Sequence, residues 1–445
     1  MKYFFVFGFI FFLLSIVLFC FIPFSNAFME IDSFAYVGYV GNYETYGQFN
    51  VPNDNICHNW YSLGYPIFLI LVRKVYGNSY YPIICIQVLL ALLIIFLIFK
   101  IASYFFSKKI AYWSMFLASI NLGFLLYPQF ILTETLLCFL LMFGLERFCN
   151  FLYKQRIASL LFSGFILGLS IVVKSAAIFF IPFLILVYLF DNKSSFFNFV
   201  YNSILFILIF CIPVGGYILR NKIVYGYYYL KAVDKVNLYT FYLPQLLEEI
   251  DGISHDEAMQ KISSLSKVKE FASGDGWEDI KALLIESVKK NPGTAVFVWL
   301  KNVTKTIFGL YTNHIKVLLY PEIKNDNCYC SFFSLKGSLW AKIWGYLSFH
   351  TDSKFLIGLG IVEVIWNVFR YLLVLIALLF LFLNRKYLIF FLFGGYLGYF
   401  AMITGHAGCA RFRFLMEPIL VVLIALALVV LYNFFLNKDE IIFTK

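Results

Sequence analysis

Two carboxylates stand just outside long apolar runs of the sequence. Asp32 follows the first apolar run, and Glu134 lies between two later ones. If the residues after the first run are helical, Asp32 and Tyr36 are i, i+4 neighbours on one helix face. A carboxylate just outside a membrane can take a proton from a hydroxyl or an amine as a general base. Asp32 can equally be a helix cap, and spacing alone leaves both roles open.

Five basic side chains also occur where apolar runs end. Such cations could stabilise the negative charge of a leaving phosphate, and an Arg fork is shaped to bind phosphate through two parallel hydrogen bonds. The alternative is that each is an ordinary helix end, or a side chain that extends to lipid headgroups. These residues are Lys174, Arg220, His406, Arg411 and Arg413.

The composition excludes a soluble protein. The chain has 445 residues, of which 62% are hydrophobic and 13% are charged. A soluble domain carries roughly 25% charged residues. The net charge of +10 therefore reflects membrane topology, and nucleic acid is not expected as a partner. We predict an all-α polytopic membrane protein with amphipathic helices on its outer face.

Ten apolar stretches are candidates to cross the membrane, because a spanning helix needs about 20 mostly apolar residues. The predicted spans are Tyr3–Phe24, Tyr81–Phe106, Ala111–Phe130, Thr135–Leu152, Ser159–Val173, Ala176–Phe190, Phe197–Ile218, Phe355–Leu383, Tyr387–Thr404 and Leu415–Leu436. The first could instead be a cleaved signal peptide, but its apolar run exceeds the usual 7–15 residues, which favours a retained anchor.

The positions of Lys and Arg in the short loops predict the orientation. With ten spans, the loop cations fall on one face, which is then cytoplasmic and carries both termini. The outer face receives two polar stretches, 28–80 and 219–354. We therefore expect an N-terminal transmembrane module (1–218), an outer helical region (219–354) and a C-terminal transmembrane module (355–445). Within the outer region, Phe297–Tyr311 is predicted to be an interfacial amphipathic helix.

A set of short motifs, in order along the chain, resembles GT-C glycosyltransferases. The similarity is greatest to protein mannosyltransferases and lipid A aminoarabinose transferases. The motifs are Asp32-Ser33-Phe34-Ala35-Tyr36, Gly64-Tyr65-Pro66, Tyr76-Gly77, Thr133-Glu134-Thr135, Arg220-Asn221-Lys222 with Tyr225-Gly226, Lys290-Asn291-Pro292-Gly293, and His406 with Arg411-Phe412-Arg413 and Glu417-Pro418.

The resemblance implies transfer of a sugar from a polyprenyl-phosphate donor to a lipid, glycan or protein acceptor at the outer face of a bacterial cytoplasmic membrane. It implies that Asp32 activates the acceptor and that Glu134 shares this role or binds the sugar. Lys174, Arg220, Arg411, Arg413 and His406 are then the donor phosphate ligands. Tyr36 and Tyr65 are then an aromatic wall of the substrate cavity, although interfacial tyrosines are also common in ordinary membrane proteins.

The motifs also depart from those of protein mannosyltransferases. Asp32 is followed by Ser33 instead of a second acidic residue, and the outer region is short. Both features favour a compact monosaccharide transferase. No cofactor is indicated, and a divalent cation near the two separated carboxylates stays an open alternative. Two other functions also stay open. One is a flippase for a lipid-linked glycan, with Glu363 and Arg370 as its intramembrane charges. The other is a polysaccharide polymerase or ligase.

Overall fold

The computed structural model describes most of the chain. The described residues are 2–20, 28–49, 61–191, 195–226, 228, 230, 237–265, 277–319, 332–335, 337–349, 351–437 and 441–444. Over these ranges the regular structure is helical, apart from an isolated bridge between Phe106 and Phe443. The all-α prediction is confirmed for this part of the chain. The end of the first predicted span, residues 21–24, lies outside the described residues.

Six of the described helices are long and apolar enough to cross a membrane, or seven if one bent pair counts as a single span. The six are α4 (Tyr81–Phe105), α7 (Thr133–Lys154), α10 (Phe196–Tyr225), α18 (Lys354–Leu383), α19 (Tyr387–Ile403, continued by the turn Thr404–His406) and α21 (Glu417–Phe435). Three more predicted spans correspond to shorter apolar helices: α1 (Lys2–Cys20), α8 (Ile157–Val173) and α9 (Phe180–Tyr188). The count of ten spans therefore stays a prediction.

The bent pair corresponds to the third predicted span, which is not one straight helix. It consists of α5 (Lys108–Ser119) and α6 (Leu122–Leu126, continued by the turn Tyr127–Gln129), with an angle of 49° between them. The Asn121 side chain causes the break, because it accepts hydrogen bonds from the amides of Gly123 and Phe124 and so starts a new helix.

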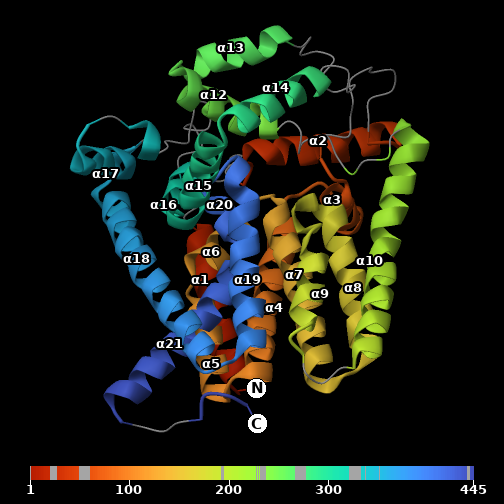
Figure 1. The fold of residues 1–445 in the computed structure, drawn as a ribbon, viewed down its shortest axis with the longest axis vertical. Coiled ribbons are helices and arrows are strands. Elements are labelled where there is room, and N and C mark those ends of the chain that lie inside the picture. Colours follow the sequence, from red (N-terminus) through yellow and green to blue (C-terminus); the bar gives the residue numbers. More distant parts are fainter. Residues whose placement is uncertain are drawn as a thin grey trace.

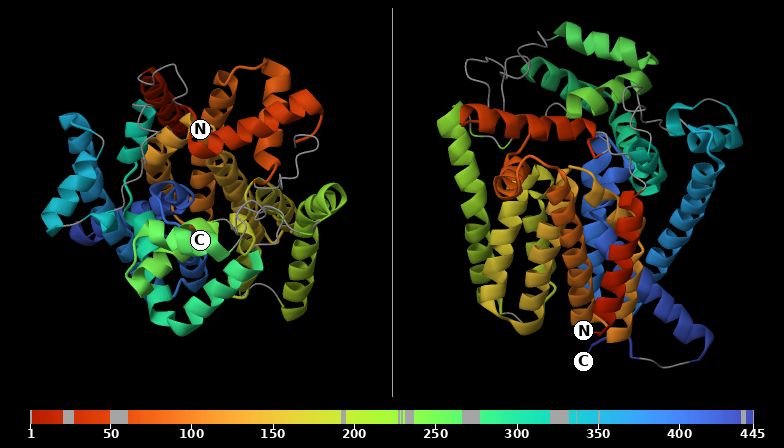
Figure 2. Two further views of the ribbon diagram at one scale, coloured as in Figure 1. Left: turned by 90° about the horizontal axis from the view of Figure 1, so that it is seen from above. Right: turned by 180° about the vertical axis from the view of Figure 1, so that it is seen from behind.

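One end of the helical bundle is covered by further helices, and we call it the capped end. There α2 (Ile31–Tyr46) lies across the bundle, from the region of α20 to the last turns of α10 (Figures 1 and 2). The other elements at this end are α3 (Gly64–Tyr76), α12 (Leu243–Asp251), α13 (His255–Leu265), α14 (Trp277–Lys290), α15 (Pro292–Phe308), α16 (Thr312–Leu319), α17 (Leu339–Ser348) and α20 (Ala410–Arg413). Both chain termini lie at the opposite end (Figure 1).

The described parts of residues 219–354, which the sequence assigns to an outer region, lie mostly at the capped end, and the division into three modules stays a prediction. The predicted boundary at residue 218 falls inside α10, which continues to Tyr225. Of the stretch predicted as an interfacial helix, residues 297–308 form part of α15, which buries Val298, Asn302 and Thr306, and residues 309–311 follow that helix. The Asn302 amide donates to the carbonyl of Gly405, so this helix packs on the loop between α19 and α20.

Two glycines allow the close approaches that shape the capped end. A Cβ at Gly64 would lie 2.6 Å from the backbone oxygen of Val172. The start of α3 can therefore approach the end of α8 this closely only because residue 64 is glycine. A Cβ at Gly408 would lie 2.2 Å from the carbonyl oxygen of Asn302, and Gly408 also has φ = +63°. These contacts bring the segments around Tyr61, Lys174 and Arg411 to one place.

Candidate functional site

Asp32 and Arg411 form an ion pair at the capped end, although 379 positions separate them in the sequence. The Arg411 Nη2 atom lies 2.6 Å from Asp32 Oδ2. The Tyr61 hydroxyl donates to the other carboxylate oxygen, Oδ1, at 3.0 Å. Both charged side chains keep some exposure, 23% for Asp32 and 16% for Arg411, so the pair is open to an incoming ligand.

Glu134 extends this pair into a row of alternating charges. Its Oε1 atom lies 3.2 Å from Arg411 Nε and 3.0 Å from Lys174 Nζ. Glu134 is 3% exposed and Lys174 is 19% exposed. The order Asp32, Arg411, Glu134, Lys174 defines what we call the charge row. Two anions and two cations balance, which is the arrangement that makes partly buried charges tolerable.

Local sequence explains why each member of the charge row lies at this boundary. Asp32 is in the first turn of α2, which begins with a capping box in which Glu30 and Ser33 exchange hydrogen bonds. Glu134 is in the first turn of α7, where a carboxylate also favours the helix dipole. Lys174 directly follows the last residue of α8, and Arg411 is in the four-residue helix α20.

The Phe412 ring links one more predicted residue, His406, to Lys174 of the charge row. Lys174 Nζ lies 5.4 Å from its centroid, and the His406 ring lies 6.0 Å from it. His406 Nδ1 also lies 3.0 Å from the carbonyl oxygen of Ile403. His406 therefore borders the charge row through Phe412, and its role at a phosphate site stays a prediction.

The surroundings of Asp32 keep it ionised. Burial raises the pKa of its carboxyl group, but the charges of Arg411 and Lys174 and the hydrogen bonds from Arg411 and Tyr61 outweigh burial, so the net pKa lies below the usual 3.8. The pKa of Tyr61 is raised, first by burial and then by the negative charge of Asp32. Asp32 is therefore a carboxylate and Tyr61 a neutral donor at neutral pH.

The two tyrosines predicted to line the substrate cavity pack behind the charge row. Tyr36 is 4% exposed and Tyr65 is 0% exposed. The Tyr36 ring meets the rings of Tyr61 and Tyr65 edge-on, at centroid distances of 5.1 and 5.2 Å. The Tyr65 hydroxyl donates to Gln87 Oε1 at 2.8 Å. Both tyrosines thus support Tyr61, which is the tyrosine that touches Asp32.

Arg220 lies at the other end of α2. Its guanidinium group donates to Asn221 Oδ1 at 3.0 Å and lies 5.8 Å from the centroid of the Phe49 ring, which follows α2. Asp32 is in the first turn of the same helix, whose 16 residues span about 24 Å. The structure therefore does not bring Arg220 together with the charge row.

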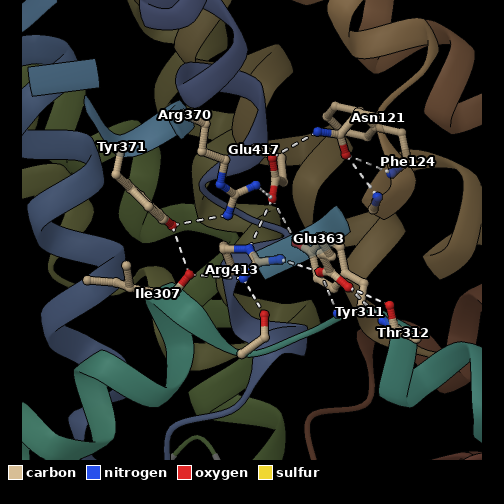
Figure 3. Close-up of polar contacts among 12 residues, drawn as sticks. Asn121, Phe124, Ile307, Tyr311, Thr312, Glu363, Arg370, Tyr371, Arg413 and Glu417 are labelled. Atoms are coloured by element: carbon tan, nitrogen blue, oxygen red, sulfur yellow. Dashed lines mark hydrogen bonds and ion pairs between the residues drawn. The ribbon is translucent and has the colours of Figure 1, made fainter. Parts of the chain in front are cut away.

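The Arg413 side chain belongs to a buried ion network of its own, which Figure 3 shows. It is 0% exposed, and its Nε atom lies 3.2 Å from Glu417 Oε1, while Nη2 lies 3.3 Å from Glu363 Oε1. Arg370 also reaches Glu417, with Nη1 3.1 Å from Oε1. The two charges considered for a flippase, Glu363 and Arg370, are thus paired inside this network.

The carboxylates of the charge row are already bridged by an arginine. A divalent cation between Asp32 and Glu134 would have to displace Arg411, which contacts both. Among the described residues, no three His, Cys, Asp or Glu side chains lie close enough together to hold a metal ion.

An open apolar groove of about 460 Å³ runs between α9 and α19. One residue of its lining, Tyr399, donates a hydrogen bond from its hydroxyl to the carbonyl of Ala176, two residues after Lys174. The groove is lined by Phe179, Phe183, Gly395, Gly398, Tyr399, Met402 and Ile403. A space of this size and polarity suits an apolar chain.

Comparison with known proteins agrees with this architecture. Residues 62–217, roughly a third of the chain, match the family described as dolichyl-phosphate-mannose-protein mannosyltransferase. The fold is also similar to that of the oligosaccharyltransferase AglB from Archaeoglobus fulgidus, solved with an inhibitory peptide and a dolichol-phosphate (TM-score 0.53, 13% identity). The chain therefore shares its fold with this archaeal oligosaccharyltransferase.

The archaeal enzyme in its apo form is similar to the same extent, with a TM-score of 0.53 and 12% identity. The form tethered to an acceptor peptide gives a TM-score of 0.51 and 13% identity. The chain is covered over 97%, 99% and 95% of its length in the three comparisons, but it spans only about half of the archaeal protein (52%, 52% and 49%). No curated protein sequence matches the chain.

Sequence reasoning missed several residues around the charge row and in the buried network. Tyr61 precedes the Gly64-Tyr65-Pro66 motif, and nothing in its spacing marks it as the partner of Asp32. Phe412 lies inside the predicted Arg411–Arg413 motif but was not given a role. For the buried network there was a usable signal, because Glu363 and Arg370 are seven residues apart and therefore lie on one face of a helix.

Proposed function

We propose that this protein is a membrane glycosyltransferase that moves a sugar from a polyprenyl-phosphate donor to a lipid, glycan or protein acceptor. The observation that carries the proposal is the charge row, which places a carboxylate and two cations at one partly exposed boundary of the bundle. Lys174 and Arg411 are the phosphate ligands in this proposal, with His406 beside them. Asp32 is the base, and Glu134 holds both cations in place.

Binding of the donor would change the partner of Arg411. A phosphate that accepts hydrogen bonds from Arg411 and Lys174 competes with Asp32 for the same guanidinium group. As Arg411 turns to the phosphate, Asp32 loses the charge that lowers its pKa and becomes a stronger base. Donor binding thereby makes Asp32 more basic, which couples binding of the donor to activation of the acceptor.

The chemical step follows from these positions. The acceptor hydroxyl or amine gives its proton to Asp32 and attacks the anomeric carbon of the sugar. The bond between that carbon and the phosphate oxygen breaks, and the electron pair leaves with polyprenyl phosphate. Lys174 and Arg411 stabilise the charge that develops on this leaving group. Attack opposite the leaving group gives inversion at the anomeric carbon.

The groove between α9 and α19 suits the polyprenyl chain. Its lining is apolar, and Tyr399 of that lining is hydrogen-bonded to the carbonyl of Ala176, two residues after Lys174. A chain lying in the groove would bring the attached phosphate to the charge row. This arrangement supports a lipid-linked donor over a soluble sugar nucleotide.

The proposal also covers the membrane side of the site and the number of sugars moved in each transfer. We place the capped end outside a bacterial cytoplasmic membrane, because the loop cations gather at the end that carries both termini. We favour transfer of a single hexose or pentose, because Asp32 is followed by Ser33 instead of a second acidic residue and the outer region, residues 219–354, is short. Residues 1–218 and 355–445 then build the membrane part, and residues 219–354 cover the donor site.

The proposal is tested by reconstituting the purified protein in liposomes with a polyprenyl-phosphate sugar labelled in the sugar. We expect labelled acceptor and free polyprenyl phosphate to form together. Movement of intact donor between leaflets without release of polyprenyl phosphate would establish the flippase instead. Products longer than one sugar would establish the polymerase. Mass spectrometry of envelope glycans with and without the protein would identify the acceptor.

A further inference from the structure

We propose that the junction between α15 and α16, residues 307–314, is a positioning element that sets Asp32 against Arg411. This inference rests on the function proposed above. The junction contacts the start of α2 on one side and the Arg413 network on the other, so it holds both sides of the charge row without belonging to it.

On the first side, the junction holds Arg413. The Arg413 Nη1 atom donates to the carbonyl oxygens of Ile307, at 2.9 Å, and Gly309. Its guanidinium carbon lies 4.1 Å from the centroid of the Tyr311 ring. Arg411 is two residues earlier in the same four-residue helix, so it cannot move far while Arg413 is held. The junction therefore fixes the position of α20.

The network ties the junction to two membrane helices as well. Glu363 of α18 accepts hydrogen bonds from the amides of Tyr311 and Thr312 at 2.7 and 2.9 Å, and from the Thr312 hydroxyl at 2.7 Å. Glu417 of α21 accepts from the Tyr311 hydroxyl at 2.9 Å and from the Asn121 amide at 2.9 Å (Figure 3).

The charges of this network balance. It contains two arginines, Arg370 and Arg413, and two glutamates, Glu363 and Glu417, all with 8% exposure or less. Buried ion pairs often contribute little net stability against apolar residues of similar size, but breaking one partner costs about 3–5 kcal/mol. Such a network is a stiff anchor, and stiffness is what a positioning element requires.

On the second side, the junction reaches α2. His314 Nδ1 lies 3.6 Å from Glu30 Oε1, and both side chains are less than 5% exposed. Glu30 is the N-terminal cap of α2 and exchanges hydrogen bonds with Ser33 in the capping box. Asp32 lies between these two residues. A shift of the junction would therefore move the base and the phosphate ligand relative to one another.

The test uses two conservative variants of the junction itself. Tyr311→Phe removes the hydroxyl that donates to Glu417, and Thr312→Val removes the hydroxyl that donates to Glu363. Neither side chain touches the charge row in any contact described above. Lys301→Gln is the matched control, because Lys301 lies in α15 before the junction and its ion pair is with Glu249 of α12.

Two measurements distinguish positioning from simple loss of stability. In steady-state kinetics, the double variant should raise the KM for the polyprenyl-phosphate donor about tenfold, as expected for one weakened charged contact. Hydrogen exchange should speed up at residues 28–36 and 407–413. Lys301→Gln should change neither. If the double variant has the wild-type KM for the donor and the wild-type rates of hydrogen exchange, the inference is overturned.

The outcomes separate this inference from the function on which it rests. If the wild-type protein turns over the donor but the junction variants behave like Lys301→Gln, the positioning role is wrong and the transferase proposal stands. If the wild-type protein does not turn over the donor, the transferase proposal fails. The exchange measurement still reports whether the junction holds residues 28–36 and 407–413.

Discussion

Arg411→Gln is the substitution whose effect follows most directly from the geometry of the charge row. Arg411 contacts Asp32 at 2.6 Å and Glu134 at 3.2 Å, and it is one of the two proposed phosphate ligands. Glutamine keeps the first three side-chain carbons and a polar end, but it is shorter than arginine and carries no charge. The variant therefore leaves Asp32 with Tyr61, leaves Glu134 with Lys174, and removes one cation from the leaving phosphate.

Two magnitudes follow from these contacts. Breaking a fully buried ion pair costs about 3–5 kcal/mol, and an exposed pair contributes about 0–1 kcal/mol. At 16% and 23% exposure the Arg411–Asp32 pair is intermediate, so we expect a loss of about 2 kcal/mol in the free energy of unfolding. Loss of a charged hydrogen bond to the phosphate, about 1.5–3 kcal/mol, lowers kcat/KM about 10- to 150-fold.

The assay is sugar transfer by the purified variant with a polyprenyl-phosphate donor, normalised to folded protein by gel filtration. Arg411→Lys is the matched variant, because it keeps the charge and loses the planar fork. It should recover part of the lost kcat/KM. If Arg411→Gln transfers sugar with the wild-type kcat/KM, Arg411 does not bind the phosphate and the reasoning is refuted.

Three further predictions follow from the same contacts. Lys174→Gln should raise the donor KM and lower kcat, and a wild-type KM would remove Lys174 from the phosphate site. Gly398 lines the apolar groove, so Gly398→Phe should raise the KM for a long-chain donor but not for a short-chain one. Gly215→Phe is the control and should change neither KM, because Gly215 lies in α10 and does not line the groove. A Cβ at either glycine meets no atom within 4 Å. Because the folded pKa of Asp32 lies below 3.8, its ion pair should stabilise the protein fully above about pH 5 and less as the pH falls through that lower pKa, seen by thermal unfolding against Asp32→Asn. A stability difference that does not vary with pH would contradict that pairing.

Topology explains which site residues could be predicted from the sequence. Asp32, Glu134, Lys174 and Arg411 each stand at the end of an apolar run, and the predicted crossings put all four at one membrane face. The structure places them within a single row of ion pairs. Their mutual contacts could not be predicted, because these depend on the close approach of α3 to α8 at Gly64.

Arg220 and Arg413 show where the same reasoning failed to bring residues together. Membrane depth says nothing about lateral position, and Arg220 lies near Phe49, at the far end of α2 from Asp32. Arg413 follows Arg411 by two residues in a helix, so the two side chains point in nearly opposite directions. This two-residue spacing could have shown from sequence alone that Arg411 and Arg413 do not share a site. The burial of Arg413 could not have been predicted, since its partners come from α15, α18 and α21.

The most direct test of the transferase proposal is the turnover number of Asp32→Asn with a purified polyprenyl-phosphate sugar and its acceptor. Loss of a general base lowers the rate about 10²- to 10⁴-fold, and the proposal predicts a loss in this range while the protein still inserts and folds. Glu44→Gln is the matched control, because Glu44 pairs with Arg73 near the other end of α2. A wild-type turnover number for Asp32→Asn would contradict the assignment of Asp32 as the base.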